Sequence, residues 1–444
     1  MVRMAIMAGV AAVSLASGSN VALAQSAPAA AEAKLDGRAV VADVRKILAA
    51  NYVLPETRPK LDAALAKGLA EGRYDVTDPG TLADRINSDM AAVAHDKHLG
   101  ITYNPAQSKE LASRPVGAGA DDAPATEAEI RQATQFNHGI VELKVLPGNI
   151  RYMDTRGFFW GGKKTAEAYD NAMRFLRDGD AVIIDMRHNG GGSPEAVQYL
   201  VSHFIDANKP LVTFYMRGES GETFKSLASL PAGRMVGKPL YVLTSGNSAS
   251  AAEEFIGHIG GYKLGELIGE TSAGAGFRNE FFPVAGGYAI SVSVGRAVLA
   301  STGKDWEGVG IAPTTKTEVG KALEVAQAHA LRRLASLATP DEKRQIEAQA
   351  ALLEAKVNPV ATALPIAKYA GAYDGDRSVT LEDGRLNYQR TGGPKVSLIP
   401  VGANEFGFEE DPAMRIQFAV AGGSVTALKL VRGDGSSVDA PRAN

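Results

Sequence analysis

The order of apolar and polar positions changes character along the chain. Between residues 36 and 94, apolar residues recur at helical spacing, as at positions 40, 41, 44, 47 and 48. Pro55 and Pro79 interrupt this run, so the pattern predicts three short helices. Residues 117–126 are rich in Ala, Asp, Gly and Pro and predict a loop.

A different pattern begins near residue 138, where short apolar runs alternate with helical stretches. Residues 181–184 are continuously apolar, which is typical of a strand buried on both faces. Other strands are predicted at 141–145, 149–153, 211–215, 240–243 and 264–268, with helices starting near 165, 193 and 250. This alternation predicts a mostly parallel α/β core with right-handed crossovers.

The C-terminal third changes pattern again. Two helices are predicted at 318–337 and 339–356, and the pattern after residue 365 is all-β. A hairpin signal, Asp383-Gly384, joins two alternating runs within 378–389. Four more short strands are predicted, at 396–399, 405–408, 415–420 and 425–431. We therefore expect a small separate β-domain.

The first residues match an export signal. Arg3 precedes a mostly apolar run at 4–16, and Ala22-Leu23-Ala24 is a small-x-small cleavage site. The apolar run is shorter than the roughly 20 residues that span a bilayer, so we expect no stable membrane anchor and a periplasmic or secreted protein. The expected units are a signal peptide (1–24), a disordered leader (25–35), a helical subdomain (36–115), the α/β core (136–338), a connecting helix (339–357) and the β-domain (366–444).

Composition narrows the chemistry. Among 444 residues, 47 basic and 50 acidic side chains leave a net charge of −3, which disfavours nucleic-acid binding as a main role. Hydrophobic residues make up 45%, enough for a large core. Cysteine is absent, which excludes disulfides, thiolate metal sites, iron–sulfur clusters and a cysteine nucleophile. Covalent chemistry is left to Ser, Thr, Lys, Asp or Glu.

Two strand ends carry candidate chemistry. Ser250 lies where a buried strand meets a helix, so its hydroxyl can face a cleft beside unpaired N–H groups. A serine there is also a common helix cap. At the other strand end, Gly190, Gly191 and Gly192 can turn backbone N–H groups toward an anion or a carbonyl oxygen. They can equally form a plain tight turn.

Three further residues are candidates by type. His98 can act as a base or lie on the surface, and its spacing from His95 also fits a metal pair, although no third ligand is evident. Glu307 lies in a Gly-rich loop and can orient a histidine or face solvent. Glu270 follows a strand and can accept backbone N–H bonds. We expect no metal and no cofactor.

The motifs in their order resemble one family. They are DMRHNGGG at 185–192, SASAAE at 248–253, GET at 269–271, EGVGIAP at 307–313 and, upstream, DKH at 96–98 and NYVLP at 51–55. Over roughly residues 36–320 the chain resembles the C-terminal processing (tail-specific) serine peptidases, in the branch of the tricorn core and interphotoreceptor retinoid-binding protein. The resemblance implies a crotonase-like (Clp-protease-like) α/β core, with the helical subdomain before it and the all-β domain after it.

The resemblance also implies a catalytic set. One branch of the family uses a Ser–Lys dyad, and Ala275 occupies the position of its lysine. The other branch uses Ser, His and Glu, and the resemblance implies Ser250 as nucleophile, His98 as base and Glu307 as its support. Ser248 is a rival nucleophile. The N–H groups of Ala251 and of Gly190 or Gly191 would form the oxyanion hole. Asp185, Arg187, Asn189 and Glu270 would support the site.

The expected function is therefore an exported serine peptidase that cleaves polypeptide or peptide substrates through an acyl-enzyme. Two alternatives remain. A non-catalytic protein on the same fold would bind a retinoid, another lipid or a peptide, and an esterase-type hydrolase would act on other acyl compounds. The oligomeric state is left open.

Overall fold

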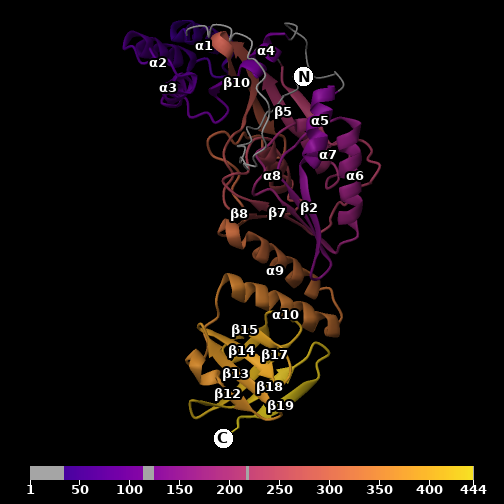
Figure 1. Cartoon of the computed structure of the whole chain (residues 1–444). Helices are drawn as coiled ribbons and strands as arrows, with labels where there is room; N and C mark the ends of the chain where they lie inside the picture. The colour runs from indigo at the N-terminus through magenta and orange to yellow at the C-terminus, as the bar shows by residue number, and fades with distance from the viewer. Residues whose placement is uncertain (1–34, 114–124, 217–219, 444) are drawn as a thin grey trace, which may run out of the picture.

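The computed structural model describes residues 35–113, 125–216 and 220–443. The predicted signal peptide, almost all of the leader and most of the loop at 117–126 lie outside the described residues. Figure 1 shows an elongated molecule with the first helices at one end, an α/β core in the middle and a β-domain at the other end. No helix in the described ranges is both long and apolar enough to cross a membrane.

The first described segment contains the three predicted helices. They are α1 (Gly37–Asn51), α2 (Arg58–Ala70) and α3 (Pro79–Ala91), followed by α4 (Pro105–Ala112). The side chain of Asp36 caps α1, and that of Asp78 caps α3, where Pro79 occupies the first turn. Their apolar faces pack against Tyr288 and Ile290 of the core. The helical segment is therefore docked on the core rather than separate from it.

A six-stranded sheet forms the centre of the core, in the order β11-β8-β7-β4-β3-β2. All pairs are parallel except the edge pair of β2 and β3. The strands are β2 (Ile140–Leu146), β3 (Ile150–Thr155), β4 (Ala181–Asp185), β7 (Leu240–Thr244), β8 (Glu266–Gly269) and β11 (Thr315–Lys316). The predicted mostly parallel α/β core is confirmed.

Helices cover both faces of this sheet. They are α5 (Glu127–Gln135), α6 (Lys163–Arg177), α7 (Pro194–Val201), α8 (Ala251–Gly261), α9 (Ala322–Ala335) and α10 (Pro340–Val357). Val182 and Ile184 of β4 pack on the side of α6, α7 and α8, and Ile183 packs on the side of α9. This explains the continuous apolar run of β4, because both faces of the strand are buried.

A second, antiparallel sheet was not predicted from the sequence, and the strand expected at 211–215 belongs to it rather than to the parallel sheet. It contains β1 (Gly100–Tyr103), β5 (Pro210–Met216), β6 (Glu222–Lys225), β9 (Phe277–Val284) and β10 (Tyr288–Leu299). β10 is its centre and pairs with β1, β5 and β9. Through β1, this sheet connects the helical segment that carries His98 to the core.

The C-terminal domain is an antiparallel meander of eight strands. They are β12 (Gly371–Tyr373), β13 (Arg377–Glu382), β14 (Arg385–Arg390), β15 (Lys395–Gly402), β16 (Glu405–Phe408), β17 (Arg415–Ala421), β18 (Ser424–Val431) and β19 (Ser437–Pro441). A bridge between Tyr373 and Arg442 brings the first strand beside the last. Tyr369, Phe406 and Phe418 are packed together inside. The predicted all-β domain is confirmed.

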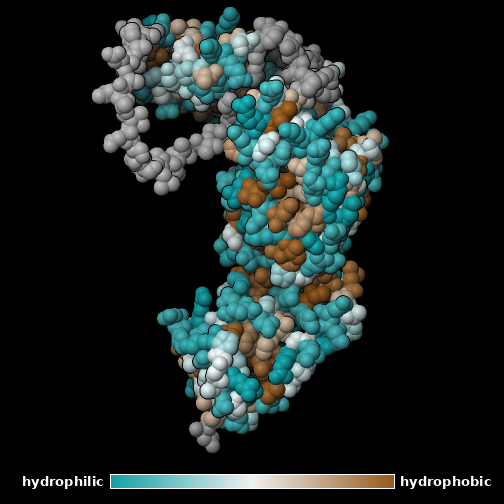
Figure 2. Space-filling view, turned by 45° about the vertical axis from the view of Figure 1, so that its right-hand side comes forward, coloured by the Kyte–Doolittle hydropathy of each residue, from teal (hydrophilic) through white to brown (hydrophobic). Residues whose placement is uncertain are grey.

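Helices α9 and α10 lie between the core and the β-domain (Figure 1). Helix α9 packs on the parallel sheet, and Ala350 of α10 belongs to the same apolar cluster. Lys356 of α10 is paired with Glu409 of the β-domain at 3.0 Å. On the face seen in Figure 2, hydrophilic residues predominate, with hydrophobic residues scattered over the core and beside its junction with the C-terminal domain.

Candidate active site

Ser250 occupies a strained backbone position at the start of α8. The strand β7 ends at Thr244, and a short turn leads to Ser250, whose φ is 57° and ψ is −122°. A non-glycine residue with this backbone costs about 1–3 kcal/mol, which the surrounding contacts must supply. One of these contacts is the Ser250 N–H, which donates to Glu253 Oε2 at 2.9 Å. The turn places the hydroxyl group at the lining of a pocket.

The glycine turn after β4 lies directly against Ser250. A Cβ added to Gly191 would stand 2.7 Å from the Ser250 Cβ and 3.0 Å from the Ala251 nitrogen. Gly191 also has a φ of 102°, in the region that favours glycine. Two motifs far apart in the sequence thus meet, and only glycine permits so close an approach.

The N–H groups of the turn are not equivalent. The Gly191 N–H donates to Asn189 Oδ1 at 2.9 Å, which fixes the turn. Among the described residues, the N–H groups of Gly190 and Ala251 have no hydrogen-bond acceptor. Of the candidate oxyanion donors, Gly190 and Ala251 are therefore available, whereas Gly191 is committed to its neighbour.

Glu253 connects the parts of this region, and it was not among the site residues predicted from the sequence. Its side chain is fully buried. Oε1 accepts from Ser272 Oγ and the Gly274 N–H, each at 2.6 Å, and Oε2 accepts from the Ala275 N–H at 2.7 Å as well as from Ser250. One carboxylate thus joins the candidate nucleophile to the loop at 272–275. An SxxE capping signal was present in the sequence, but it resembles any helix start.

The rival serine has a different environment. Ser248 is fully buried, its hydroxyl donates to the Met186 carbonyl at 2.8 Å, and it accepts from the Ser245 N–H at 3.0 Å. This geometry is that of a structural hydroxyl. Ser250, by contrast, lines the pocket.

Asp185 and Arg187 lie at the end of β4, just before the glycine turn, and form an ion pair there. The Asp185 carboxylate is buried, pairs with Arg187 at 2.6 Å and accepts from the Tyr152 hydroxyl at 2.8 Å. Arg187 also donates to the Val319 carbonyl at 2.8 Å. Both residues are thus supporting groups within the fold rather than groups of the pocket lining.

The helical segment brings His98 to the site region. Lys97, beside it, donates from Nζ to the carbonyl of Ala273 in the glycine-rich loop. The backbone N–H of His98 donates to Asp96 Oδ1 at 2.8 Å. The Nδ1 atom of the His98 imidazole is buried and has no hydrogen-bond partner among the described residues. Burial lowers the pKa of His98, although the Asp96 charge opposes this. The imidazole is therefore neutral at neutral pH, the form that accepts a proton.

Glu307 is held by backbone groups. Its Oε2 accepts hydrogen bonds from the backbone N–H groups of Gly276, at 2.6 Å, and Phe277, at 2.8 Å. Its Oε1 is buried and has no hydrogen-bond partner among the described residues. Burial, reinforced by the charge of Asp96, raises the pKa of Glu307 to about 7. Burial and the same charge also raise the pKa of Tyr52, at the end of α1. Tyr52, Asp96, His98 and Glu307 thus form one electrostatic cluster.

The three candidate catalytic residues are not linked to one another by hydrogen bonds. Within residues 35–113, 125–216 and 220–443, none joins His98 to Ser250 or to Glu307. Such bonds are often long in a free enzyme and tighten only when substrate binds. The unpaired Nδ1 of His98 and Oε1 of Glu307 are the two atoms that the implied support would use.

Two candidates lie away from this arrangement. Glu270 is exposed, and it is its backbone, not its carboxylate, that bonds to Thr244. Glu253 has the backbone-binding role expected for Glu270. His95 is exposed, and the described part of the chain contains no group of three His, Cys, Asp or Glu side chains that could hold a metal.

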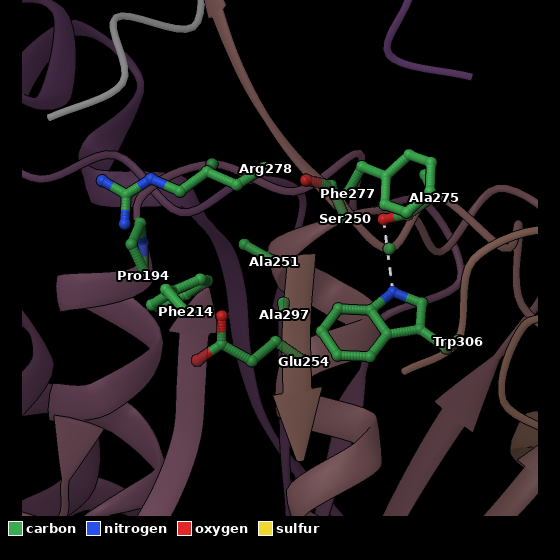
Figure 3. A pocket seen from close by; sticks show the side chains of 12 residues that line it. Pro194, Phe214, Ser250, Ala251, Glu254, Ala275, Phe277, Arg278, Ala297 and Trp306 are labelled. Carbon is green, nitrogen blue, oxygen red and sulfur yellow. Dashed lines mark hydrogen bonds between the residues drawn. The ribbon is translucent and has the colours of Figure 1, made fainter. Parts of the chain in front are cut away.

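A pocket of about 410 Å³, including its open mouth, lies next to Ser250. Its walls are largely apolar, from Phe214, Ala297 and Trp306, and the Trp306 indole donates to the Ala275 carbonyl at 3.2 Å. Figure 3 shows two charged side chains entering among them, Glu254 from α8 and Arg278 from β9. A strained serine, two available N–H donors and an adjoining pocket are the parts of a serine hydrolase site.

Comparisons with known proteins agree with this class. Residues 149–317 match the model of peptidase family S41, and residues 22–143 match the model of the N-terminal domain of that peptidase in eukaryotic IRBP. The chain belongs to peptidase family S41, a family of serine peptidases. The resemblance inferred from the motifs is confirmed.

A relative is the carboxy-terminal processing protease CtpB of Bacillus subtilis, 28% identical over 170 residues. The match covers 38% of this chain and about a third (33%) of the length of that relative. Among solved structures, a putative peptidase from Parabacteroides merdae has a TM-score of 0.46 at 17% identity, covering 68% of this chain and 96% of that chain. The photosystem II D1 C-terminal processing protease has a TM-score of 0.41 at 16% identity, covering 64% and 94%.

Proposed function

We propose that the protein is a serine peptidase that cleaves polypeptides or peptides through an acyl-enzyme formed on Ser250. The observation that carries the proposal is the Ser250 turn. A strained serine stands at a helix start, in contact with the glycine turn and at the lining of a pocket. Family membership supports the same chemistry.

In this mechanism Ser250 Oγ attacks the scissile carbonyl carbon while His98 takes its proton. The carbonyl oxygen, which becomes an oxyanion, accepts the N–H groups of Ala251 and Gly190. His98 then returns the proton to the leaving amine, and a water molecule hydrolyses the acyl group by the reverse sequence. The neutral state of His98 supports its role as the base.

Glu307 supports His98 in this proposal. Its unpaired Oε1 and the unpaired Nδ1 of His98 are the groups available for that interaction, directly or through a water molecule. Because the pKa of Glu307 is raised to about 7, ionisation of this carboxyl would strengthen the support as the pH rises through neutrality.

Export is a second part of the proposal. It is supported by the charge, apolar run and small-residue site of residues 1–24. N-terminal sequencing of the protein recovered from outside the cytoplasm should begin at Gln25. Recovery of the full-length chain from the cytoplasm alone would contradict it.

Parallel assays on peptide and ester libraries test the activity. We expect cleavage of internal peptide bonds that the Ser250→Ala variant does not perform. Cleavage of esters alone would favour the acyl hydrolase alternative. A protein that cleaves neither and co-purifies with lipid would favour the carrier alternative.

A further inference from the structure

The pocket beside Ser250 contains two buried charged side chains that the proposed mechanism does not use. Glu254 is 4% exposed and Arg278 is 8% exposed, and both line the pocket. Charged side chains are rarely so buried unless they have a partner or a function. Their position next to the candidate nucleophile connects them with substrate selection.

The pocket lies where a substrate side chain would enter. Ser250 and Ala251 line it, and they are also the proposed nucleophile and an oxyanion donor. Because the cavity adjoins both groups, the substituent of an acyl carbon held between them can enter it.

The walls suit a long, unbranched stem. Phe214 and Trp306 present aromatic surface and Ala297 leaves room between them. Aromatic faces also attract cations, and Arg278 already stands 4.9 Å from the ring centre of Phe214. An aliphatic chain that ends in a positive charge would use both properties.

The two charged side chains that line the pocket, Glu254 and Arg278, have opposite signs. One guanidinium, from Arg278, is surrounded by four carboxylates that act on it electrostatically, those of Glu195, Glu222, Glu254 and Glu280. Of the four, only Glu254 also lines the pocket. Arg278 therefore does not make the site favourable for an acidic side chain.

The carboxylate of Glu254 has one hydrogen bond among the described residues, and that bond is long. One oxygen is 3.4 Å from His258 Nε2, a long contact, and burial raises the pKa of the carboxyl. An apolar side chain would remove the remaining water from this carboxyl without replacing its hydrogen bonds. A cation would replace them with a charge-assisted bond and favour the ionised form.

We propose that this pocket receives the side chain that precedes the scissile bond, and that Glu254 selects a basic residue there. This inference rests on the proposed function, because it assigns the substrate of the same site. Lysine fits the combination best, with its stem along Phe214 and Trp306 and its ammonium group at Glu254.

The test uses three peptides that differ only at that position, carrying lysine, norleucine or glutamate. Norleucine keeps the four-carbon stem of lysine and lacks the charge. In the wild type we expect kcat/KM for lysine to exceed that for norleucine by at least about tenfold, with glutamate lowest. In Glu254→Gln the lysine-to-norleucine ratio should fall to about 1. Glu222→Gln, which removes an acid outside the pocket lining, should keep the wild-type ratio.

Labelling of Ser250 by a fluorophosphonate probe is measured on every variant. If the wild type is labelled but prefers norleucine or glutamate, or if Glu254→Gln keeps the lysine preference, this inference is overturned and the proposed function stands. If the wild type is not labelled, both fall. Should Glu254→Gln fail to fold, Ala297→Leu decides. It should lower cleavage after lysine and norleucine alike and spare cleavage after alanine, and an unchanged profile would overturn the inference.

Discussion

Replacing Glu253 with glutamine probes the contact network around Ser250. Each carboxylate oxygen of Glu253 accepts two hydrogen bonds, Oε1 from Ser272 and Gly274 and Oε2 from Ser250 and Ala275. The amide group of glutamine has only one oxygen. Whichever way it is oriented, its NH₂ group faces two donors that lose their acceptor.

A buried donor left unpaired costs about 1–3 kcal/mol, so two cost about 2–6 kcal/mol. We expect Glu253→Gln to lower the unfolding free energy of the core by this amount and to slow labelling of Ser250, because the Ser250 turn loses its brace. Fluorescence of the buried Trp306 during urea unfolding reports the first effect. Glu270→Gln is the control, since that carboxylate is exposed, and it should change stability by less than about 0.5 kcal/mol. A loss below about 1 kcal/mol in Glu253→Gln would refute the reasoning.

Three further predictions follow from single contacts. Because the folded-state pKa of Glu307 is raised from 4.5 to about 7, the contribution of this carboxyl to stability is present below about pH 4.5 and is lost as the pH rises to about 7. Melting temperatures across that window should decline more in the wild type than in Glu307→Gln. Parallel curves for the two proteins would contradict this. Arg187→Leu leaves Asp185 buried without its partner and should cost about 3–5 kcal/mol in urea unfolding; a cost under about 1 kcal/mol would exclude a bracing role. Lys97→Met removes the exposed hydrogen bond to the Ala273 carbonyl. It should slow labelling of Ser250 severalfold without moving the unfolding midpoint. An unchanged labelling rate would show that this hydrogen bond does not position the His98 loop.

Local patterns in the sequence were sufficient to predict many of the helices and strands of the core. Strand β4 is buried on both faces and therefore appears as an unbroken apolar run, and Ser193-Pro194 marks the start of α7 by its cap and its first-turn proline. The glycines at 190–192 predicted a turn whose N–H groups can face an anion or a carbonyl oxygen, but not the contact between Gly191 and Ser250. These features depend on neighbouring residues, so a single sequence reveals them.

Features that depend on distant partners were missed. Strand β10 has almost no alternation because most of its residues are buried between the helical segment and the rest of the core. Glu253 and Glu254 are adjacent and look like two ordinary acidic residues of a first helical turn. One binds the backbone of a loop about 20 residues away and the other lines a pocket, a difference that only the packing reveals.

Ser250 is the nucleophile of the proposed mechanism, and its reactivity is the central question. The most direct measurement is to react the wild-type protein with a fluorophosphonate probe, digest it and locate the modified residue by mass spectrometry. We predict one adduct, on Ser250, that is lost in Ser250→Ala, slowed in His98→Ala and retained in Ser248→Ala. An adduct on Ser248, or equal labelling of the wild type and Ser250→Ala, would contradict the account.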